Sequence, residues 1–275
     1  MTFTVPVGLA QAGRAKARQL IPLSEDQSLV LIDPEMMHIL STETRAWHEL
    51  VELRIGETRV LKSSISLADG ATGLCVQIFD VPETATLTLL QEVQVGAVSS
   101  WRHVVIVRGE GRIEIRRQVH AAADRAKAEL VCVGRGTRAA SFSVSDEILS
   151  DASNTQAEIH TKISLNDMSR SEVRARLRVN EQSVGGEFHE RIDHLLLGDG
   201  TQAAAIPELE VKTHDVRCGH GATTSRPQAT DLFYLMSRGL SASEADQLLE
   251  ASFLGDLLQA VPESIQTQAF RVIWR

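Results

Sequence analysis

The sequence predicts a mainly β protein with a helical appendage at its C-terminal end, because the hydrophobic period changes along the chain. From about Ser28 to about Val216, short segments alternate apolar and polar residues between glycine-containing turn signals, the pattern of half-buried strands. After about Arg226 the period lengthens to that of an amphipathic helix. We therefore divide the chain into an N-terminal extension at 1–27, a β core at 28–225 and a helical region at 226–275.

The strand-like segments fall into two kinds. Residues 173–179, 112–116 and 50–55 alternate strictly, which predicts strands with one face in water, whereas residues 104–107 and 130–133 are apolar throughout, which predicts strands covered on both faces. This periodicity is equally compatible with a sandwich, a barrel and a parallel β-helix. The glycine-containing turn signals lie at Asp69–Gly70, Arg108–Gly111, Gly134–Gly136, Gly185–Gly186 and Gly198–Gly200.

The helical region contains two apolar stripes and a start signal between them. The first stripe is closed by Arg238 and Gly239, a basic last turn followed by a C-cap glycine, and Ser241 and Glu244 then match a capping box. The second stripe is ended by Pro262. We expect part of these stripes to cover the β core; their apolar residues are Leu232, Phe233, Leu235 and Met236, then Leu254, Leu257, Leu258 and Val261.

Composition limits the location and the partners. The 275 residues include 28 basic and 36 acidic side chains, a formal net charge of -8 that argues against broad nucleic-acid binding. No apolar run approaches the length of a membrane span. Cys75, Cys132 and Cys218 are few and far apart, as in a reducing compartment, and no apolar segment follows the basic residues 13–18 as a secretory signal requires. We expect a cytoplasmic protein with no membrane or nucleic-acid partner.

Motifs of common enzymes are missing. The sequence has no GxxxxGK[ST] phosphate loop, so we expect no nucleotide to be bound by this chain, and it has no GxGxxG, GxSxG or CxxC motif. His189 and His194 are five residues apart, which places them on different faces of a strand or a helix. We therefore expect a protein that is not an enzyme by itself.

Cys218 and His220 are the candidate metal ligands. In an extended chain they point to the same side, and a thiolate beside an imidazole suits a soft or borderline metal. Gly219 and Gly221 leave room around His220, whereas His214 would join only if the strand continued through the preceding turn. Because two ligands fall short of the usual three or four, a small buried cysteine beside an ordinary histidine remains an open alternative.

Two stretches resemble the SufB/SufD family of the SUF iron–sulfur assembly system. Residues 207–211 and 215–223 are similar to the PxLEI and DVxCxHGAT signature of SufD. Residues 231–240, with Glu244, Ala245 and Phe253, resemble the LFYLxSRG…EEA…GF helix pair of both subunits. The close match runs from about residue 195 to 261.

The resemblance implies a right-handed parallel β-helix core whose C-terminal helices dock on a SufC-type ABC ATPase. It also implies a second SufB/SufD-like subunit, in a homodimer or a heterodimer, with a transient iron–sulfur cluster between the two β-helices. A ligand histidine of SufD falls on His220 and its neighbouring cysteine on Cys218. The implied ATPase-binding residues are Phe233, Tyr234, Leu235, Arg238 and Leu240.

The function expected from this resemblance is that of a scaffold subunit for iron–sulfur cluster assembly. Residues 198–202 lack the cysteine that SufB carries there and the N-terminal helical region is short, which favours a SufD-like role, although residues 222–225 read more like SufB. One alternative is a purely structural subunit of the same complex with no metal ligand. A β-helix enzyme acting on polysaccharides is disfavoured by an aromatic content of 4%.

Overall fold

A computed structural model describes residues 37–41, 45–259 and 261–275, with side chains described from Leu50 onward. The predicted N-terminal extension at 1–27 lies outside the described residues. The strands are β1 (Met37–Ser41), β2 (Arg45–Glu52), β3 (Thr58–Leu67), β4 (Thr72–Val81), β5 (Thr86–Val95), β6 (Ser100–Gly109), β7 (Arg112–Ala121), β8 (Lys127–Gly136), β9 (Ser141–Ser150), β10 (Gln156–Leu165), β11 (Arg170–Val179), β12 (Gly186–Leu196), β13 (Gln202–Val211) and β14 (Val216–Ser225).

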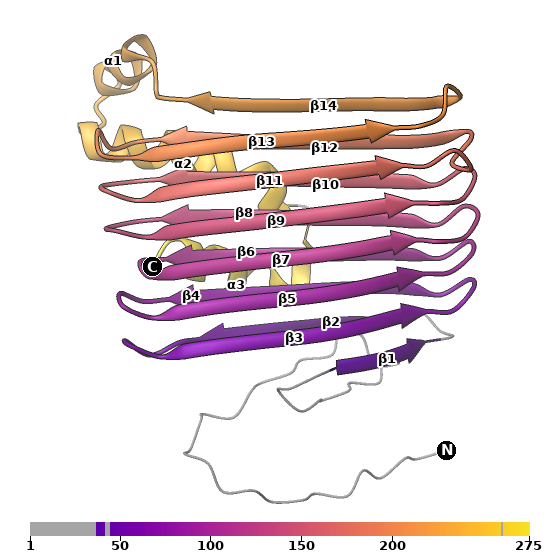
Figure 1. Ribbon diagram of the computed structural model, residues 1–275. Coiled ribbons are helices and arrows are strands. Elements are labelled where there is room, and N and C mark those ends of the chain that lie inside the picture. The colour runs from indigo at the N-terminus through magenta and orange to yellow at the C-terminus, as the bar shows by residue number, and fades with distance from the viewer. Residues whose placement is uncertain (1–36, 42–44, 260) are drawn as a thin grey trace, which may run out of the picture.

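Successive strands alternate between two parallel sheets. The odd-numbered strands form one seven-stranded sheet and the even-numbered strands form the other (Figure 1). Each coil advances the chain by 26 to 32 residues, as shown by the pairing of Thr86 with Arg112 and of Arg170 with Gln202. This topology is a parallel β-helix, which confirms the predicted fold and excludes the sandwich and the barrel.

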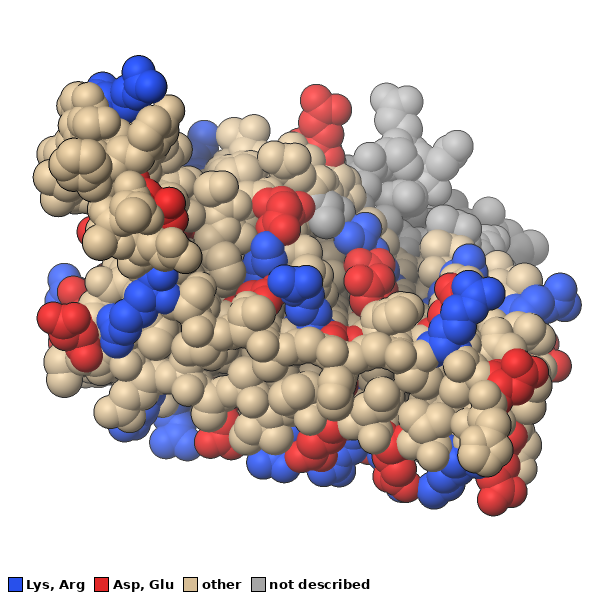
Figure 2. Space-filling view, turned by 90° about the horizontal axis from the view of Figure 1, so that it is seen from above, with Lys and Arg blue, Asp and Glu red and all other residues tan. Residues whose placement is uncertain are grey.

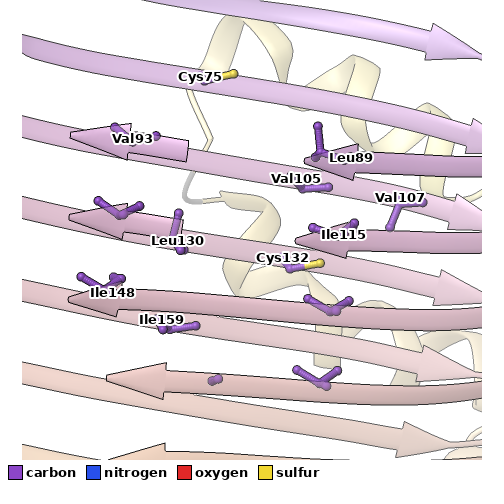
Figure 3. Packing of buried hydrophobic residues seen from close by; sticks show 14 of the residues in the cluster. Cys75, Leu89, Val93, Val105, Val107, Ile115, Leu130, Cys132, Ile148 and Ile159 are labelled. Atoms are coloured by element: carbon purple, nitrogen blue, oxygen red, sulfur yellow. The ribbon is translucent and has the colours of Figure 1, made fainter. Parts of the chain in front are cut away.

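The interior of the β-helix is filled by alternate side chains from both sheets. Leu89 and Ile115 from the odd sheet meet Val105, Leu130 and Ile159 from the even sheet (Figure 3). In-register pairing stacks inward residues above one another from coil to coil, so the same alternation that predicts each strand also builds one continuous core.

One predicted turn is wrong. Gly134 and Gly136 lie inside β8 and face the interior. A Cβ atom on Gly136 would lie 2.9 Å from a ring carbon of Phe142, and one on Gly134 would lie 3.2 Å from the same ring. These glycines are therefore needed for space around Phe142 and not for a change of chain direction.

Helices α2 (Ala242–Gln259) and α3 (Glu263–Ile273) cover the outer face of the even sheet (Figure 1). This cover explains why β6 and β8 are apolar on both faces, as predicted. Helix α3 was not predicted as a separate helix, although Ile265, Ala269 and Val272 recur at helical spacing. Outward residues of the sheet and apolar residues of the helices form a second core, which includes Val76, Ile78, Val104, Ile106, Val131, Val133, Leu254, Leu258, Ile265, Ala269 and Ile273.

Polar contacts fix α2 on the sheet as well. The buried carboxylate of Glu250 accepts hydrogen bonds from Ser164 Oγ at 2.7 Å and from Asn166 Nδ2 at 2.9 Å, and it lies 3.1 Å from Arg135 Nε. Lys162 Nζ contacts Asp256 at 2.6 Å and donates to the Phe253 carbonyl at 3.2 Å. Helix α2 is therefore held to β8 and β10 by apolar and charged contacts together.

Helix α1 (Ala229–Ser237) contacts α2 but buries none of its own residues. Gly239 follows it with a left-handed φ of 98°, and Ser241 and Glu244 form the predicted capping box at the start of α2. Helix α1 therefore does not cover the β core, whereas the second stripe does, as expected for part of the two stripes; its residues are Leu254, Leu257, Leu258 and Val261. Among the described residues, no helix is long and apolar enough to cross a membrane.

A candidate metal site at the open end of the β-helix

The last coil, β13 and β14, is the end of the stack. Each of these strands is the outermost strand of its sheet, with a neighbour on one side only. Figure 2 looks onto this end. The inward residues here are only partly buried, in contrast to those of the central coils; they are Ala203, Ala205, Leu209, Val216 and Cys218. The interior of the β-helix is therefore accessible at this end.

Cys218 and His220 both lie on the inward face of β14, two residues apart on an unbroken strand. They stand opposite Phe188 and Glu190 of β12. Cys218 is half-buried, and burial raises the pKa of its thiol, whereas 52% of the His220 side chain is exposed. His214 lies in the bend before β14 and does not join this face.

Glu190 was not identified from the sequence. Its inward carboxyl group is buried, and its Oε1 lies 3.6 Å from Nδ1 of His220. Burial raises its pKa to about 8; the charge of Glu208 adds to this rise, and the backbone amide of Glu208 offsets part of it. The sequence does contain a signal for Glu190: it is an acidic residue between Phe188 and Ile192, at a position where the alternation predicts an inward side chain.

The ligand set of this end is incomplete. No group of three or more His, Cys, Asp or Glu side chains within the described ranges is arranged to hold a metal ion. Cys218 and His220 supply a thiol and an imidazole, the donors that suit iron and iron–sulfur clusters. The residues fit a cluster only if a second chain supplies further ligands.

The other two cysteines are remote from any surface. Cys75 and Cys132 are fully buried in the core between the sheets (Figure 3). Burial raises the pKa of Cys132 to about 12, so its thiol stays protonated and unreactive at neutral pH. Cys218 is therefore the accessible cysteine of the described part of the chain.

The two histidines of β12 do not form a site together. His189 is exposed on the outer face, whereas His194 is buried on the inner face with its Nε2 3.1 Å from Ser171 Oγ. Burial lowers the pKa of His194 to about 4, so this side chain is neutral at pH 7. The two histidines therefore lie on opposite faces of β12, as their spacing of five residues predicts.

The predicted partner-binding residues lie on and after α1, which projects from the body at the upper left of Figure 2. Phe233 and Tyr234 are 75% and 56% exposed, and the guanidinium of Arg238 lies 5.1 Å from the centre of the Tyr234 ring. Leu235 and Leu240 are half-buried. The structure thus presents two aromatic side chains and an arginine to solvent on one short helix.

Comparison with known proteins identifies the family. The model of the SUF system FeS cluster assembly SufBD core domain matches residues 43–253. The chain belongs to the SufBD family.

Among the relatives of this SufBD chain is an iron–sulfur cluster assembly SufBD family protein from Mycobacterium leprae, 28% identical over 54% of this chain and 17% of the relative. The iron–sulfur cluster assembly protein SufD of Escherichia coli is 29% identical over 38% of this chain and 24% of its own length. A SufBD family protein from Synechocystis is 39% identical over 25% of this chain and 15% of its own length. The matched segments thus span less than a quarter of each of these relatives.

Proposed function

We propose that this SufBD chain is a scaffold subunit on which an iron–sulfur cluster is assembled, and that it is not an enzyme by itself. The observation that carries the proposal is the placement of Cys218 and His220 side by side on the inward face of β14, at the accessible end of the β-helix. The cluster is the cargo of this site, held transiently by a thiolate and an imidazole.

The missing ligands come from a second SufB/SufD-like subunit that meets this one at the open end. The outer edges of β13 and β14 carry backbone groups that can pair with another chain. Pro207 interrupts the donors of β13, which leaves β14 as the better edge. Such contact would surround Cys218 and His220 with protein. Homodimer and heterodimer both satisfy this geometry.

A SufC-type ABC ATPase docks on α1 and supplies the nucleotide-driven step. Exposed aromatic residues and an arginine are the side chains that most often dominate binding energy at protein interfaces, and Phe233, Tyr234 and Arg238 provide them. Leu235, in the last turn of α1, and Leu240, just after the helix, are half-buried apolar residues of the same segment. Because this chain has no phosphate loop, the ATPase binds the nucleotide. We propose that this complex works in the cytoplasm.

The polysaccharide alternative requires paired carboxylates with aromatic platforms. A groove of about 330 Å³ on the outer face of the odd sheet does contain Glu92 and Glu147, but no Phe, Tyr or Trp is among the residues that line it. The alternative of a subunit without a metal ligand has the same fold and the same ATPase partner as the scaffold. Substitution of Cys218 and His220 is therefore the experiment that distinguishes the two.

The test is anaerobic co-purification of the tagged chain with the SufC-type ATPase of the same organism, followed by an absorption spectrum of the eluate. We expect both proteins and a sulfur-to-iron charge-transfer band. The double variant Cys218→Ser/His220→Ala should keep the ATPase and lose the band, whereas His214→Ala, in the adjacent bend, should keep both. An unchanged band in the double variant would favour the subunit without a ligand.

A further inference from the structure

Glu190 is a buried acid without a side-chain hydrogen bond. Its side chain has no exposed area, neither carboxyl oxygen reaches a side-chain donor among the described residues, and the backbone amide of Glu208 offsets only part of the cost of burying its charge. Phe188 and Ile192, its inward neighbours on β12, pack into the apolar core. Placing an ionisable group there is unfavourable unless a partner compensates it, so the position requires a functional explanation.

The group that Glu190 faces is His220. Parallel pairing sets the two residues opposite each other on β12 and β14, and Oε1 of Glu190 lies 3.6 Å from Nδ1 of His220. The half-exposed imidazole therefore directs Nδ1 toward the buried carboxyl group. In metal sites, the ring nitrogen that does not bind the metal commonly donates to a carboxylate, which fixes the tautomer and the orientation of the ring.

Other charged groups near Glu190 are already paired. Glu208 of β13 lies 2.7 Å from Arg174 and also pairs with Arg176, both on the outer face of the odd sheet. Arg191, next in sequence, points outward and binds Asp193 at 2.7 Å. Glu190 is thus the carboxyl group available to His220.

We propose that Glu190 is a positioning residue for His220: a carboxyl oxygen of Glu190 accepts a hydrogen bond from Nδ1–H and leaves Nε2 free to bind iron at the open end of the β-helix. The inference rests on the proposed role of His220 as a ligand. Glu190 acts through the histidine and not as a ligand, in agreement with the lack of a three-ligand group in the described part of the chain.

The experiment is an anaerobic titration with Co²⁺, a spectroscopic substitute for Fe²⁺, of the full chain in complex with its SufB/SufD-like partner subunit, in wild type, Glu190→Leu, Glu190→Gln and His220→Ala. We expect Glu190→Leu to weaken cobalt binding about 10- to 100-fold, the usual effect of removing such a partner. Glu190→Gln should recover most of the affinity, because its amide oxygen can still accept the Nδ1–H bond. His220→Ala should abolish the binding that depends on this site.

Thermal unfolding of the metal-free proteins separates positioning from a structural role. Glu190→Leu should melt at or above the wild-type temperature, because it replaces a buried carboxyl group that lacks a side-chain hydrogen bond in the metal-free protein with an apolar side chain of similar size. Lower melting temperatures in both variants, with cobalt affinity unchanged, would assign Glu190 to folding and overturn the inference.

Two further outcomes would also overturn it. If Glu190→Gln binds cobalt as weakly as Glu190→Leu, the carboxylate ligates the metal directly. If both bind as tightly as wild type while His220→Ala does not bind, His220 needs no positioning partner, and the scaffold proposal survives alone. Wild-type cobalt binding that does not depend on His220 would contradict the proposed function and this inference together.

Discussion

Arg117 and Asp146 form an ion pair in the middle of the apolar interior. Both are fully buried; Nε and Nη2 of Arg117 donate to the two carboxylate oxygens at 2.7 and 2.6 Å. Nη1 donates to the carbonyls of His103 at 3.2 Å and Val131 at 3.0 Å, on the opposite sheet. The guanidinium thereby joins two coils of the odd sheet to two strands of the even sheet.

We expect Arg117→Met to lower the free energy of unfolding by about 3–5 kcal/mol, because it leaves the carboxylate of Asp146 buried without its partner. The double variant Arg117→Met/Asp146→Leu should regain much of this loss, since no buried charge remains. Urea unfolding followed by circular dichroism measures both. Equal stabilities for the single and double variants would show that the unpaired carboxylate is not the cause.

Stability should also fall in mild acid because of His194. The pKa of this side chain is lowered to about 4 by burial, with a smaller opposing effect from Asp193, whereas a histidine in an unfolded chain has a pKa of about 6.5. Between these values the unfolded chain binds a proton that the folded chain excludes, so folding stability decreases as pH falls through this window. The full effect is about 3 kcal/mol.

Urea unfolding at pH 7 and at pH 4.5 tests this prediction. His194→Gln should lose less stability than wild type between the two conditions, because glutamine does not titrate. His189→Gln, on the exposed face of the same strand, is the matched control. A wild-type pH dependence in His194→Gln would place the acid-sensitive group elsewhere.

At the scale of single residues, the sequence predicts whether a side chain faces the interior of the β-helix, but it does not predict which residues that side chain contacts. The inward position of Arg117 follows from its place between Ile115 and Val119, and that of Glu190 from its place between Phe188 and Ile192. Their partners lie 29 and 30 residues away, a separation fixed by the register of the coils. Because no sequence repeat reports that register, Glu190 could not be joined to His220 before the structure was known.

At the scale of elements, α1 is the part most accessible to a partner. We expect Phe233→Ala/Tyr234→Ala to weaken binding of the SufC-type ATPase at least tenfold, because these rings are exposed here and would be buried in the complex. The fold should be unaffected, since α1 contributes no buried residue. Calorimetric titration against the purified ATPase measures the affinity.

Ile55→Ala provides the control for this surface. Ile55 is an apolar residue that is 77% exposed in the turn before β3, far along the stack from α1 (Figure 1). Its substitution should leave ATPase binding unchanged. Wild-type affinity in the α1 variant would mean that the partner docks elsewhere.

Individual strands could be predicted where the spacing of apolar residues along a short segment is regular. Alternation identifies β7 and β11, and unbroken apolar runs identify the covered strands β6 and β8. The distinction between a β-helix, a sandwich and a barrel was not available from alternation, because all three use it; it came only from the family resemblance. Gly134 and Gly136 were misread because a glycine needed for space around Phe142 looks the same in sequence as one needed for a turn.

At the scale of the whole molecule, the last coil ends the stack with each of its strands paired on one side only. The end formed by β13 and β14 has free edges, and we expect it to pair with a second subunit. Ala222→Lys places a charge on the exposed inward side of β14 and should prevent pairing, as inward charges do on natural edge strands.

Sedimentation at increasing concentration, alone and with a SufB/SufD-like partner, measures that association. Ala204→Lys is the matched control, because Ala204 is exposed on the outward side of β13. It should associate as wild type does. Equal association of both variants would show that the open end is not the contact.

The path of the chain through α1 has a mechanical consequence. Helix α1 lies in sequence between β14 and α2, and α2 is fixed across β8 and β10 through Glu250 and Lys162. A force on α1 is therefore transmitted to the β-helix at two places: at its last coil, through β14, and near its middle, through α2. Such a force would be shared between the terminal strand, which carries Cys218 and His220, and helix α2, which is packed against the middle of the stack.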